Sequence, residues 1–312
     1  MKNPIIKSPI NYTGNKYRLL DQFKTYFPYK CSTFVDLFCG GATVGFNVNA
    51  DNVILIDSNP RVIELLKTLA KEDIEKIINQ IEANIEKYNL SYSYKNKYEY
   101  YKTLGYVSGN NGLKNFNQEG YYKLREDYNN LEDKNSFEAN MMLYTLMVYA
   151  FNNDIRFNSY GKFNLPVGKT DFNKNNYEKL IAFNKRAKEI NYQFICEDFR
   201  SPEIKNILLN ADYVYCDPPY LITTAVYNEN NGWSENEEKE LLDLLKSLDQ
   251  NNVKFSLSNV IKKEGKENTL LTEWVNDNNY NKNSINYSYR SSSYNKKNRD
   301  SNEEEVLITN GK

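Results

Sequence analysis

Two β-type runs near the start of the chain, each followed by a helix-like segment, restrict what it can fold into. Residues 34–38 form an apolar run around Asp36 that breaks at Gly40-Gly41, after which residues 42–46 are expected to begin a helix. Residues 53–56 form a second run that ends at Asp57, and a helix opens behind Asn59-Pro60, where proline suits the first turn. Strand-helix units at this spacing are typical of a parallel, doubly wound sheet.

The same alternation of β-type runs and helix-like segments occurs again near the end of the chain, after a long segment that lacks β-type runs. Strands are expected at residues 193–196, 213–216, 253–258 and 305–309, with helices at 201–209, 234–245 and 272–275. Between the two parts, apolar residues recur at helical spacing. We therefore predict an α/β fold built on a Rossmann-like sheet: residues 1–70 and 191–312 form one domain, and residues 71–190 form a mostly helical insertion.

The composition excludes several kinds of chemistry. The chain has no histidine, which removes the Ser/His and Cys/His nucleophile pairs and most zinc sites, and we expect no metal. Its four cysteines show no metal-ligand spacing and are expected to be reduced and mostly buried. The formal charge of −1 means that contact with nucleic acid would depend on local basic patches. Without a long apolar run, a soluble, cytoplasmic protein is expected.

The stretch Asp217-Pro218-Pro219-Tyr220, at the end of an expected strand, combines an acid, two prolines and an aromatic ring within four residues. The two prolines offer carbonyl oxygens in a fixed backbone without an N–H donor. An acid and two such carbonyls suit a site that holds an amino group, and the tyrosine ring could stack on a flat base that bears it. Taken alone, the stretch fits an ordinary Pro-Pro turn equally well.

Acids at the ends of other expected strands indicate a cofactor site. Asp36, Asp57, Asp198 and Asp217 all lie at or near such ends, where parallel sheets bind ligands. The turn after the first strand, Phe38-Cys39-Gly40-Gly41-Ala42, is neither a G-x-G-x-x-G sequence nor a phosphate-binding loop. A cofactor with a ribose and a base but no phosphate therefore fits better than a dinucleotide.

The motifs resemble, in order, those of Dam-like DNA adenine-N6 methyltransferases, the D12 class with a DPPY motif. Residues 12–16 resemble the amino-terminal motif, with Tyr12 in place of tryptophan and Asn15 in place of a glycine. Residues 36–41 resemble the first glycine motif, and residues 156–168 resemble the segment R-x-N-x-x-G-x-F-N-x-P-x-G. Residues 305–310 resemble the final strand. The tract from about residue 71 to 140 matches no motif.

This resemblance implies an S-adenosyl-L-methionine-dependent enzyme that methylates the N6 amine of a flipped adenine in duplex DNA. Asp217 and the Pro218 carbonyl would orient the amine, and Tyr220 would hold the base. The catalytic residues implied are Asp217, Pro218, Pro219 and Tyr220. The implied cofactor contacts are Tyr12, Lys16, Asp36, Phe38, Gly40, Asp57, Asp198, Phe199 and Asp217.

The inserted residues 71–190 occupy the position of the family's target-recognition region. DNA contacts are expected from Arg156, Asn158, Lys162, Asn164 and Lys169, and from Arg290 in a second basic tract at residues 282–299. A monomer or weak dimer is expected. The recognition sequence, for which GATC is the family's commonest target, and the presence of a cognate restriction endonuclease are left open.

Two kinds of alternative function also remain open. A Pro-Pro-aromatic motif serves any planar exocyclic amine, so cytosine in DNA or adenine in RNA are other substrates to be separated by identifying the methylated nucleoside. A catalytically silent nucleic-acid-binding module of the same fold is the second alternative, and cofactor binding would distinguish it.

Overall fold

The computed structural model describes residues 5–12, 14–107, 109–222, 233–285 and 304–311, and the chain divides into two compact units. The sheet unit comprises Lys16–Cys39, Asn47–Ser58 and Asn191–Lys312. The helical unit comprises Met1–Asn15, Gly40–Phe46 and Asn59–Ile190. The helical unit ends where the predicted insertion ends but also takes in earlier residues. The assignment of residues 71–190 to target recognition stays a prediction.

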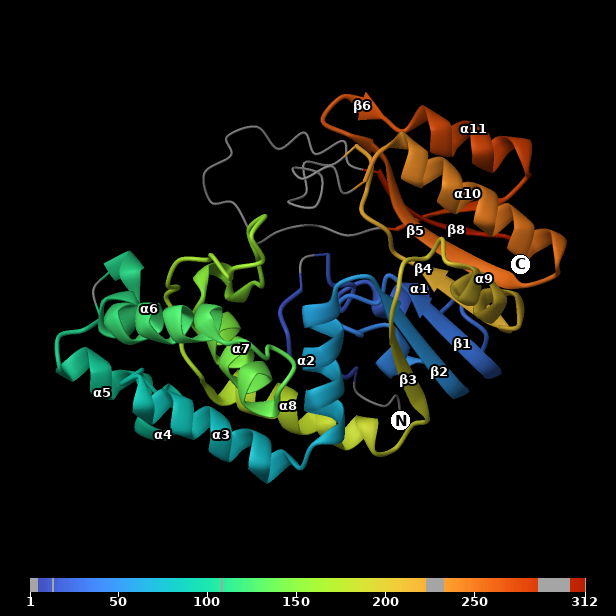
Figure 1. Ribbon diagram of the computed structural model, residues 1–312. Helices are drawn as coiled ribbons and strands as arrows, with labels where there is room; N and C mark the ends of the chain where they lie inside the picture. The colour runs from blue at the N-terminus through green and yellow to red at the C-terminus, as the bar shows by residue number, and fades with distance from the viewer. Residues whose placement is uncertain (1–4, 13, 108, 223–232, 286–303, 312) are drawn as a thin grey trace. The chain divides into compact units, whose positions relative to one another are not determined.

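The strands of the described residues all belong to the sheet unit and form one sheet (Figure 1). They are β1 (Cys31–Leu37), β2 (Ala50–Asp57), β3 (Tyr192–Cys196), β4 (Tyr213–Cys216), β5 (Lys254–Lys263), β6 (Lys266–Glu267), β7 (Asn281–Ser284) and β8 (Glu304–Thr309). Their order is β3-β2-β1-β4-β5-β8-β7, with β6 paired to β5. The neighbours from β3 to β5 are parallel, whereas β8 and β7 are antiparallel additions. The predicted α/β class with a mainly parallel sheet is confirmed.

Both faces of the central strands are covered within the sheet unit, as parallel strands require. On one face, Val35, Val214 and Leu257 join the core formed with α9 (Pro202–Leu209), α10 (Glu235–Gln250) and α11 (Thr269–Asp277). On the other face, the ring of Phe23 in α1 (Leu20–Phe23) lies 6.0 Å from that of Tyr215. The alternation along β4 therefore places successive side chains in two different cores.

Local sequence signals explain where two of these helices begin. Ser234 and Glu237 form a capping box at the start of α10, as predicted. Ser201 caps α9, and Pro202 occupies its first turn, where its missing N–H costs nothing. α9 follows β3 and α10 follows β4 along the chain, so their caps lie next in sequence to residues of the candidate site.

Three local expectations were wrong. The helix expected at residues 42–46 is a single 3₁₀ turn at Gly45–Asn47, because Ala42 has a φ of 59° and the next residues are poor helix formers. The polar edge strand β7 was not foreseen, because its Asn-Lys-Asn-Ser sequence lacks an apolar face. Cys196 is exposed, since β3 lies at the edge of the sheet; all four cysteines are free.

The helical unit consists of helices around one apolar helix. Its α-helices are α2 (Pro60–Lys71), α3 (Ile74–Lys87), α4 (Ser93–Asn96), α5 (Tyr98–Thr103), α6 (Lys114–Asn130), α7 (Phe137–Tyr149) and α8 (Lys174–Ala187), with 3₁₀ turns at Gly109–Asn111 and Phe151–Asn153. Every residue of α7 from Ala139 to Tyr149 is buried, and α7 contacts α2, α3 and α6. Among the described residues, no helix combines the length and apolar character needed to cross a membrane.

Candidate active site

The strand-end acids gather at one edge of the sheet unit. Asp57 ends β2, Asp217 directly follows β4, and the Asp217 amide donates to the carbonyl of Leu37 at the end of β1. On the other side of β2, the Glu197 amide, next to Asp198, donates to the Asp57 carbonyl. The order of connection reverses between β1 and β4, so this edge is the ligand-binding position of an open α/β sheet.

Asp217 is held by a cation and a phenol. Its Oδ1 lies 3.1 Å from Lys16 Nζ and accepts a hydrogen bond of 3.0 Å from the Tyr220 hydroxyl. The same hydroxyl lies 3.1 Å from Ser258 Oγ on β5, and Lys16 Nζ lies 5.1 Å from the centre of the Tyr220 ring. Lys16 Nζ is also 3.9 Å from Glu305 Oε1 on β8. The carboxylate, ammonium, phenol and hydroxyl thus form one connected polar cluster.

This Asp217 cluster lies where ionic groups interact strongly. The Lys16 and Glu305 side chains are only 7% and 5% exposed, and Asp217 is 18% exposed. Burial raises the pKa of Asp217, while the charge and hydrogen bond of Lys16 and the hydroxyl of Tyr220 oppose that rise. Burial, together with the charge of Asp217, also raises the pKa of Tyr220 well above its usual range, so the phenol is a hydrogen-bond donor.

A three-ring cluster lies beside the turn that follows β1. Phe38, with a φ of 65°, has its ring centre 5.4 Å from that of Phe199 and 5.6 Å from that of Trp233. The Phe199 and Trp233 ring centres are 5.8 Å apart. Trp233 Nε1 donates a hydrogen bond of 2.7 Å to Glu238, a buried carboxylate that also accepts from the Asn259 side chain. These rings form an apolar wall in which Phe199 and Trp233 are buried and Phe38 is half-buried, so a planar base would meet the wall mainly at Phe38.

Sequence reasoning missed Trp233, Glu238, Glu305 and Ser258. The available signal was weak: Trp233 directly precedes a capping box, and Glu238 follows five residues later on an otherwise apolar helix face. Glu305 and Ser258 gave no local signal, because their partners lie far away along the chain.

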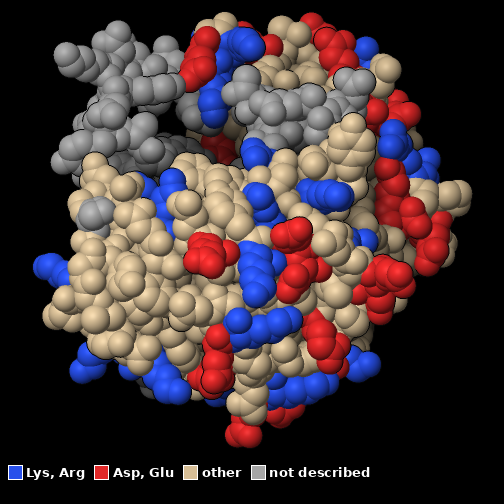
Figure 2. Space-filling model, turned by 60° about the vertical axis from the view of Figure 1, so that its left-hand side comes forward, with Lys and Arg blue, Asp and Glu red and all other residues tan. Residues whose placement is uncertain are grey.

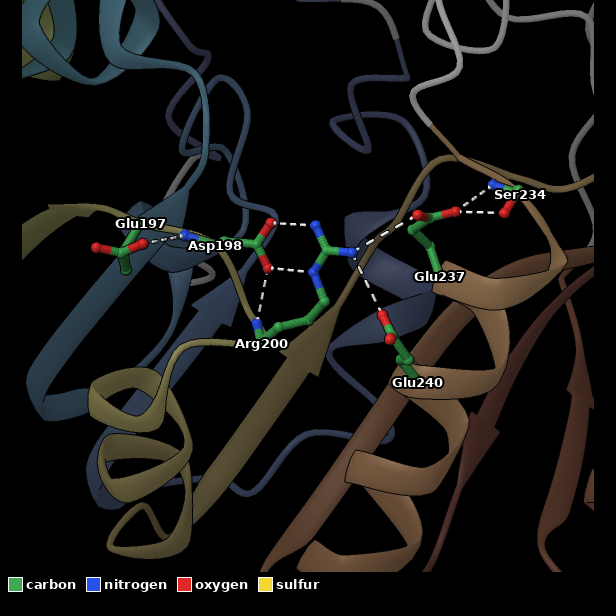
Figure 3. A network of polar contacts seen from close by, with 6 residues as sticks. All are labelled: Glu197, Asp198, Arg200, Ser234, Glu237 and Glu240. Atoms are coloured by element: carbon green, nitrogen blue, oxygen red, sulfur yellow. Dashed lines mark hydrogen bonds and ion pairs between the residues drawn. The ribbon is translucent and has the colours of Figure 1, made fainter.

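Asp198, two residues after the end of β3, is part of a separate ionic network (Figure 3). Arg200 Nε donates to Asp198 Oδ1 at 2.8 Å, and its NH2 group donates to Oδ2 at 2.7 Å. The Arg200 amide also donates to Oδ1, at 2.8 Å. These hydrogen bonds hold the pKa of Asp198 below its usual value. NH1 of Arg200 reaches Glu237 at 3.6 Å and Glu240 at 3.3 Å on α10.

The remaining predicted cofactor residues divide between the units. Asp36 is buried within β1, and Asp57 is half-buried at the end of β2, both in the sheet unit. Tyr12 and Gly40 belong to the helical unit. Gly40 has a φ of +46°, and a Cβ atom there would lie 2.7 Å from the Tyr12 ring, so the position requires glycine. The roles of these residues remain predictions.

The predicted DNA-contacting segment is a tight hairpin of the helical unit. Phe157 and Phe163 pair across it, and the Asn158 side chain accepts hydrogen bonds from the amides of Tyr160 and Lys162. Asn158 therefore closes the turn. Tyr160, at the tip, is 86% exposed.

The basic side chains of this segment point outward. Arg156, Lys162 and Lys169 are exposed, and Arg156 Nε donates to the Asn164 side chain at 2.9 Å. Arg290 lies outside the described residues. On the face shown in Figure 2, Lys and Arg side chains lie among Asp and Glu side chains, in keeping with the small net charge.

Comparison with known proteins gives one family. The model described as "D12 class N6 adenine-specific DNA methyltransferase" matches residues 12–293. The chain is 40% identical to the type II methyltransferase M.FokI of Planomicrobium okeanokoites over 314 residues, which is 99% of this chain and 43% of M.FokI. It is 35% identical to the modification methylase StsI of Streptococcus sanguinis, covering 98% of this chain and 43% of StsI.

A shorter relative matches over most of its own length. The DNA adenine methylase of Escherichia coli K12 is 25% identical over 270 residues, covering 85% of this chain and 82% of the relative. By contrast, the chain spans less than half the length of M.FokI and StsI.

Proposed function

This chain belongs to the D12 class of N6 adenine-specific DNA methyltransferases, and from that premise we propose that it transfers a methyl group from S-adenosyl-L-methionine to the N6 amine of a flipped adenine in duplex DNA. The observation that carries the proposal is the Asp217 cluster. It places the acid of the D-P-P-Y motif at the ligand-binding edge of the sheet, with Lys16 and Tyr220 on one of its oxygens.

The sheet unit contains groups that fit this cofactor. The Asp57 carboxylate suits ribose hydroxyls, the rings of Phe38 and Phe199 suit a purine, and Asp198 suits the purine's amino group. No element of the turn after β1 matches a phosphate-binding loop, which agrees with a phosphate-free nucleoside. When bound, the cofactor supplies a methyl group on a sulfonium, which is already a good leaving group.

The chain's own task is to orient the target amine. Adenine's exocyclic nitrogen is a weak nucleophile, because its lone pair is delocalised into the ring. Asp217 and the carbonyl of Pro218 accept its two hydrogens, which favours a tetrahedral nitrogen whose lone pair points at the methyl group. A carboxylate offers about four lone-pair sites, so Asp217 accepts from the amine while it keeps Lys16 and Tyr220. No histidine is needed for this step.

Tyr220 holds the flipped base in this scheme. Flipping costs a few kcal/mol, and stacking on an aromatic ring returns about 1–3 kcal/mol. The hydrogen bonds from its hydroxyl to Asp217 and Ser258 fix the ring next to the acid that orients the amine.

The direct test is to identify the methylated nucleoside. Purified protein, methyl-labelled S-adenosylmethionine and unmodified plasmid are incubated, and the DNA is hydrolysed for mass spectrometry. We expect label in N6-methyldeoxyadenosine and far less of it with Asp217→Ala over the same time. Label in N4-methylcytosine, label only in added RNA, or no label with well-folded protein would show that the proposed reaction is wrong.

The hairpin around Arg156 is proposed to contact DNA. Its exposed Arg156, Lys162 and Lys169 suit phosphate contacts, and Tyr160 projects from the tip. Arg156→Glu should lower DNA affinity and reduce the slope of affinity against salt by about one. The exposed Lys174, on α8 of the same unit, gives a matched charge reversal that should change the slope less. An unchanged slope with Arg156→Glu argues against phosphate contact there.

The names of the longer relatives suggest a setting for this activity. Because these relatives are called type II methyltransferase or modification methylase, we propose that this protein protects DNA against a restriction endonuclease of the same specificity. Modification-sensitive sequencing of DNA from cells that express it would define the protected sequence. Absence of protection from every endonuclease that cuts at that sequence would contradict this role.

A further inference from the structure

Asp198 accepts more hydrogen bonds from Arg200 than an acid at the end of a strand requires. It accepts two parallel side-chain hydrogen bonds from Arg200, through both carboxylate oxygens, and a third from the Arg200 backbone amide. Such a fork fixes both the position and the plane of a carboxylate, which a lysine cannot do. The pair is about 40% exposed, with side-chain exposures of 45% for Arg200 and 39% for Asp198, so its contribution to the free energy of folding is small.

The other contacts of Arg200 link this carboxylate to α10. Its NH1 group reaches Glu237 at 3.6 Å and Glu240 at 3.3 Å, while Glu237 also accepts from the Ser234 amide at the start of the helix (Figure 3). Arg200 is thus surrounded by acids on two elements, α10 and the loop after β3. Its orientation is set by the helix cap on one side and by Asp198 on the other.

The apolar wall is linked to this fixed acid through Arg200, whose Cζ lies 5.6 Å from the centre of the Phe199 ring. Phe199, the residue between Asp198 and Arg200, is 6% exposed and belongs to the three-ring cluster with Phe38 and Trp233. A planar base against this cluster would have one edge toward the Asp198–Arg200 pair. An ionised carboxylate accepts hydrogen bonds only, so it favours a base edge with an amino group and disfavours one with a carbonyl.

From this arrangement we propose that Arg200 is a positioning residue that fixes Asp198 to select the amino group of the cofactor's adenine. This inference rests on the proposed function, because it takes S-adenosylmethionine as the cofactor. Arg200 does not touch the cofactor in this role. Arg200 acts through Asp198. Its NH1 group pairs with Glu237 and Glu240, and these ion pairs restrict the orientation of the guanidinium.

The test compares two cofactors by calorimetry without DNA: S-adenosylmethionine, and its 6-oxo analogue with hypoxanthine in place of adenine. The wild-type protein should prefer the amino form, because a carbonyl facing Asp198 brings two hydrogen-bond acceptors together. Arg200→Gln should reduce this preference about tenfold, which corresponds to about 1.4 kcal/mol and is close to the lower limit for a hydrogen bond to a charged group. A loss of folding stability alone would weaken both cofactors equally.

Two further variants separate positioning from charge. Lys239→Gln removes one positive charge from α10, where Lys239 pairs with Glu235 at 3.8 Å, so it should leave the preference unchanged. Arg200→Lys keeps the charge without the fork and should lose part of the preference. In the double variant Asp198→Asn/Arg200→Gln, the arginine change should add nothing to the effect of Asp198→Asn.

The outcomes distinguish this inference from the function on which it rests. If the wild-type protein prefers the amino form and Arg200→Gln keeps that preference in full, Arg200 has no positioning role and the proposed function still holds. Equal weakening of both cofactors by Arg200→Gln likewise leaves only a structural role. If the folded wild-type protein binds neither cofactor, the proposed function is wrong and this inference with it.

Discussion

Asp198 and Asp217 follow strands of the same sheet, β3 and β4, and each is paired with a cation, yet their electrostatic surroundings are opposite. Asp198 is 39% exposed and held by both arms of Arg200, and its pKa lies below the usual value. Asp217 is 18% exposed and held at one oxygen by Lys16, and its pKa lies above the usual value because burial outweighs the attraction of the lysine.

The difference shows how one residue type serves two tasks in one site. An arginine fork at a half-exposed carboxylate produces a rigid acceptor that stays ionised. A lysine beside a more buried carboxylate is a point charge that leaves the acid sensitive to its surroundings. The first suits selection of a cofactor group that does not react, and the second suits an amine whose charge changes during the reaction.

Removing the two carboxylates gives the largest expected contrast. Asp217→Ala should reduce the rate of methyl transfer at saturating cofactor by about 10²–10³-fold, the range for loss of one preorganised hydrogen-bonding group at the reacting centre. Asp198→Ala should instead raise KM for S-adenosylmethionine by about tenfold, as expected for one charged hydrogen bond, and change kcat little. Transfer of labelled methyl groups to plasmid DNA measures both. Equal losses of kcat in the two variants would contradict the assignment of separate roles to Asp217 and Asp198.

Lys16→Met tests whether the cation keeps Asp217 ionised. The acid must be ionised to accept from the amine, so activity falls as the pH drops through the pKa of Asp217. Lys16 lowers that pKa, so its removal should move the acid limb of the kcat profile to higher pH, by about 1–3 units for a close opposite charge.

The matched control for this change is Lys30→Met, which breaks an exposed ion pair with Asp51 in the same unit and should leave the acid limb in place. An unshifted limb in Lys16→Met would mean that Lys16 does not control the ionisation of Asp217. Because Lys16 is buried beside Glu305, folding of the variant is checked by thermal melting.

The Tyr220 side chain has two proposed functions: its ring stacks on the base, and its hydroxyl donates to Asp217. Two substitutions separate these functions. Tyr220→Ala should lower kcat/KM for DNA by roughly 10–100-fold, which corresponds to about 1–3 kcal/mol of stacking. Tyr220→Phe keeps the ring but loses the hydrogen bonds to Asp217 and Ser258, so it should cost only a few-fold, near 1 kcal/mol. If the phenylalanine variant is as impaired as the alanine variant, the hydroxyl matters more than stacking.

The contrast between these acids also marks what could be predicted from sequence. The strands and their terminal acids follow from local patterns: runs of four residues, each followed by an acid, produced β3 and β4 within one residue of their observed bounds, whereas β2 begins three residues earlier than predicted. The capping box of α10 was equally local. The family resemblance was confirmed over residues 12–293, since it depended on short motifs in a fixed order.

The partners that make the two acids different could not be predicted. Arg200 lies two residues from Asp198, but nothing in the sequence indicates that its side chain turns back to the acid rather than into solvent. Lys16 meets Asp217 from about two hundred residues away, and the motif that contains it predicted cofactor contact instead. Such pairings depend on how the strands are ordered in the sheet, which local periodicity does not reveal.

The smallest expected effect is the pH dependence of cofactor binding. Because Arg200 lowers the pKa of Asp198, this acid should remain ionised from pH 5 to pH 7, and the Kd for S-adenosylmethionine should change less than about twofold. As the pH is lowered, kcat should fall before cofactor binding weakens, since the pKa of Asp217 is raised and that of Asp198 is lowered. Calorimetry and methyl transfer in the same buffers measure the two quantities. If Kd rises in step with the loss of kcat, one ionisation governs both events, and the separate roles assigned to the two carboxylates cannot be correct.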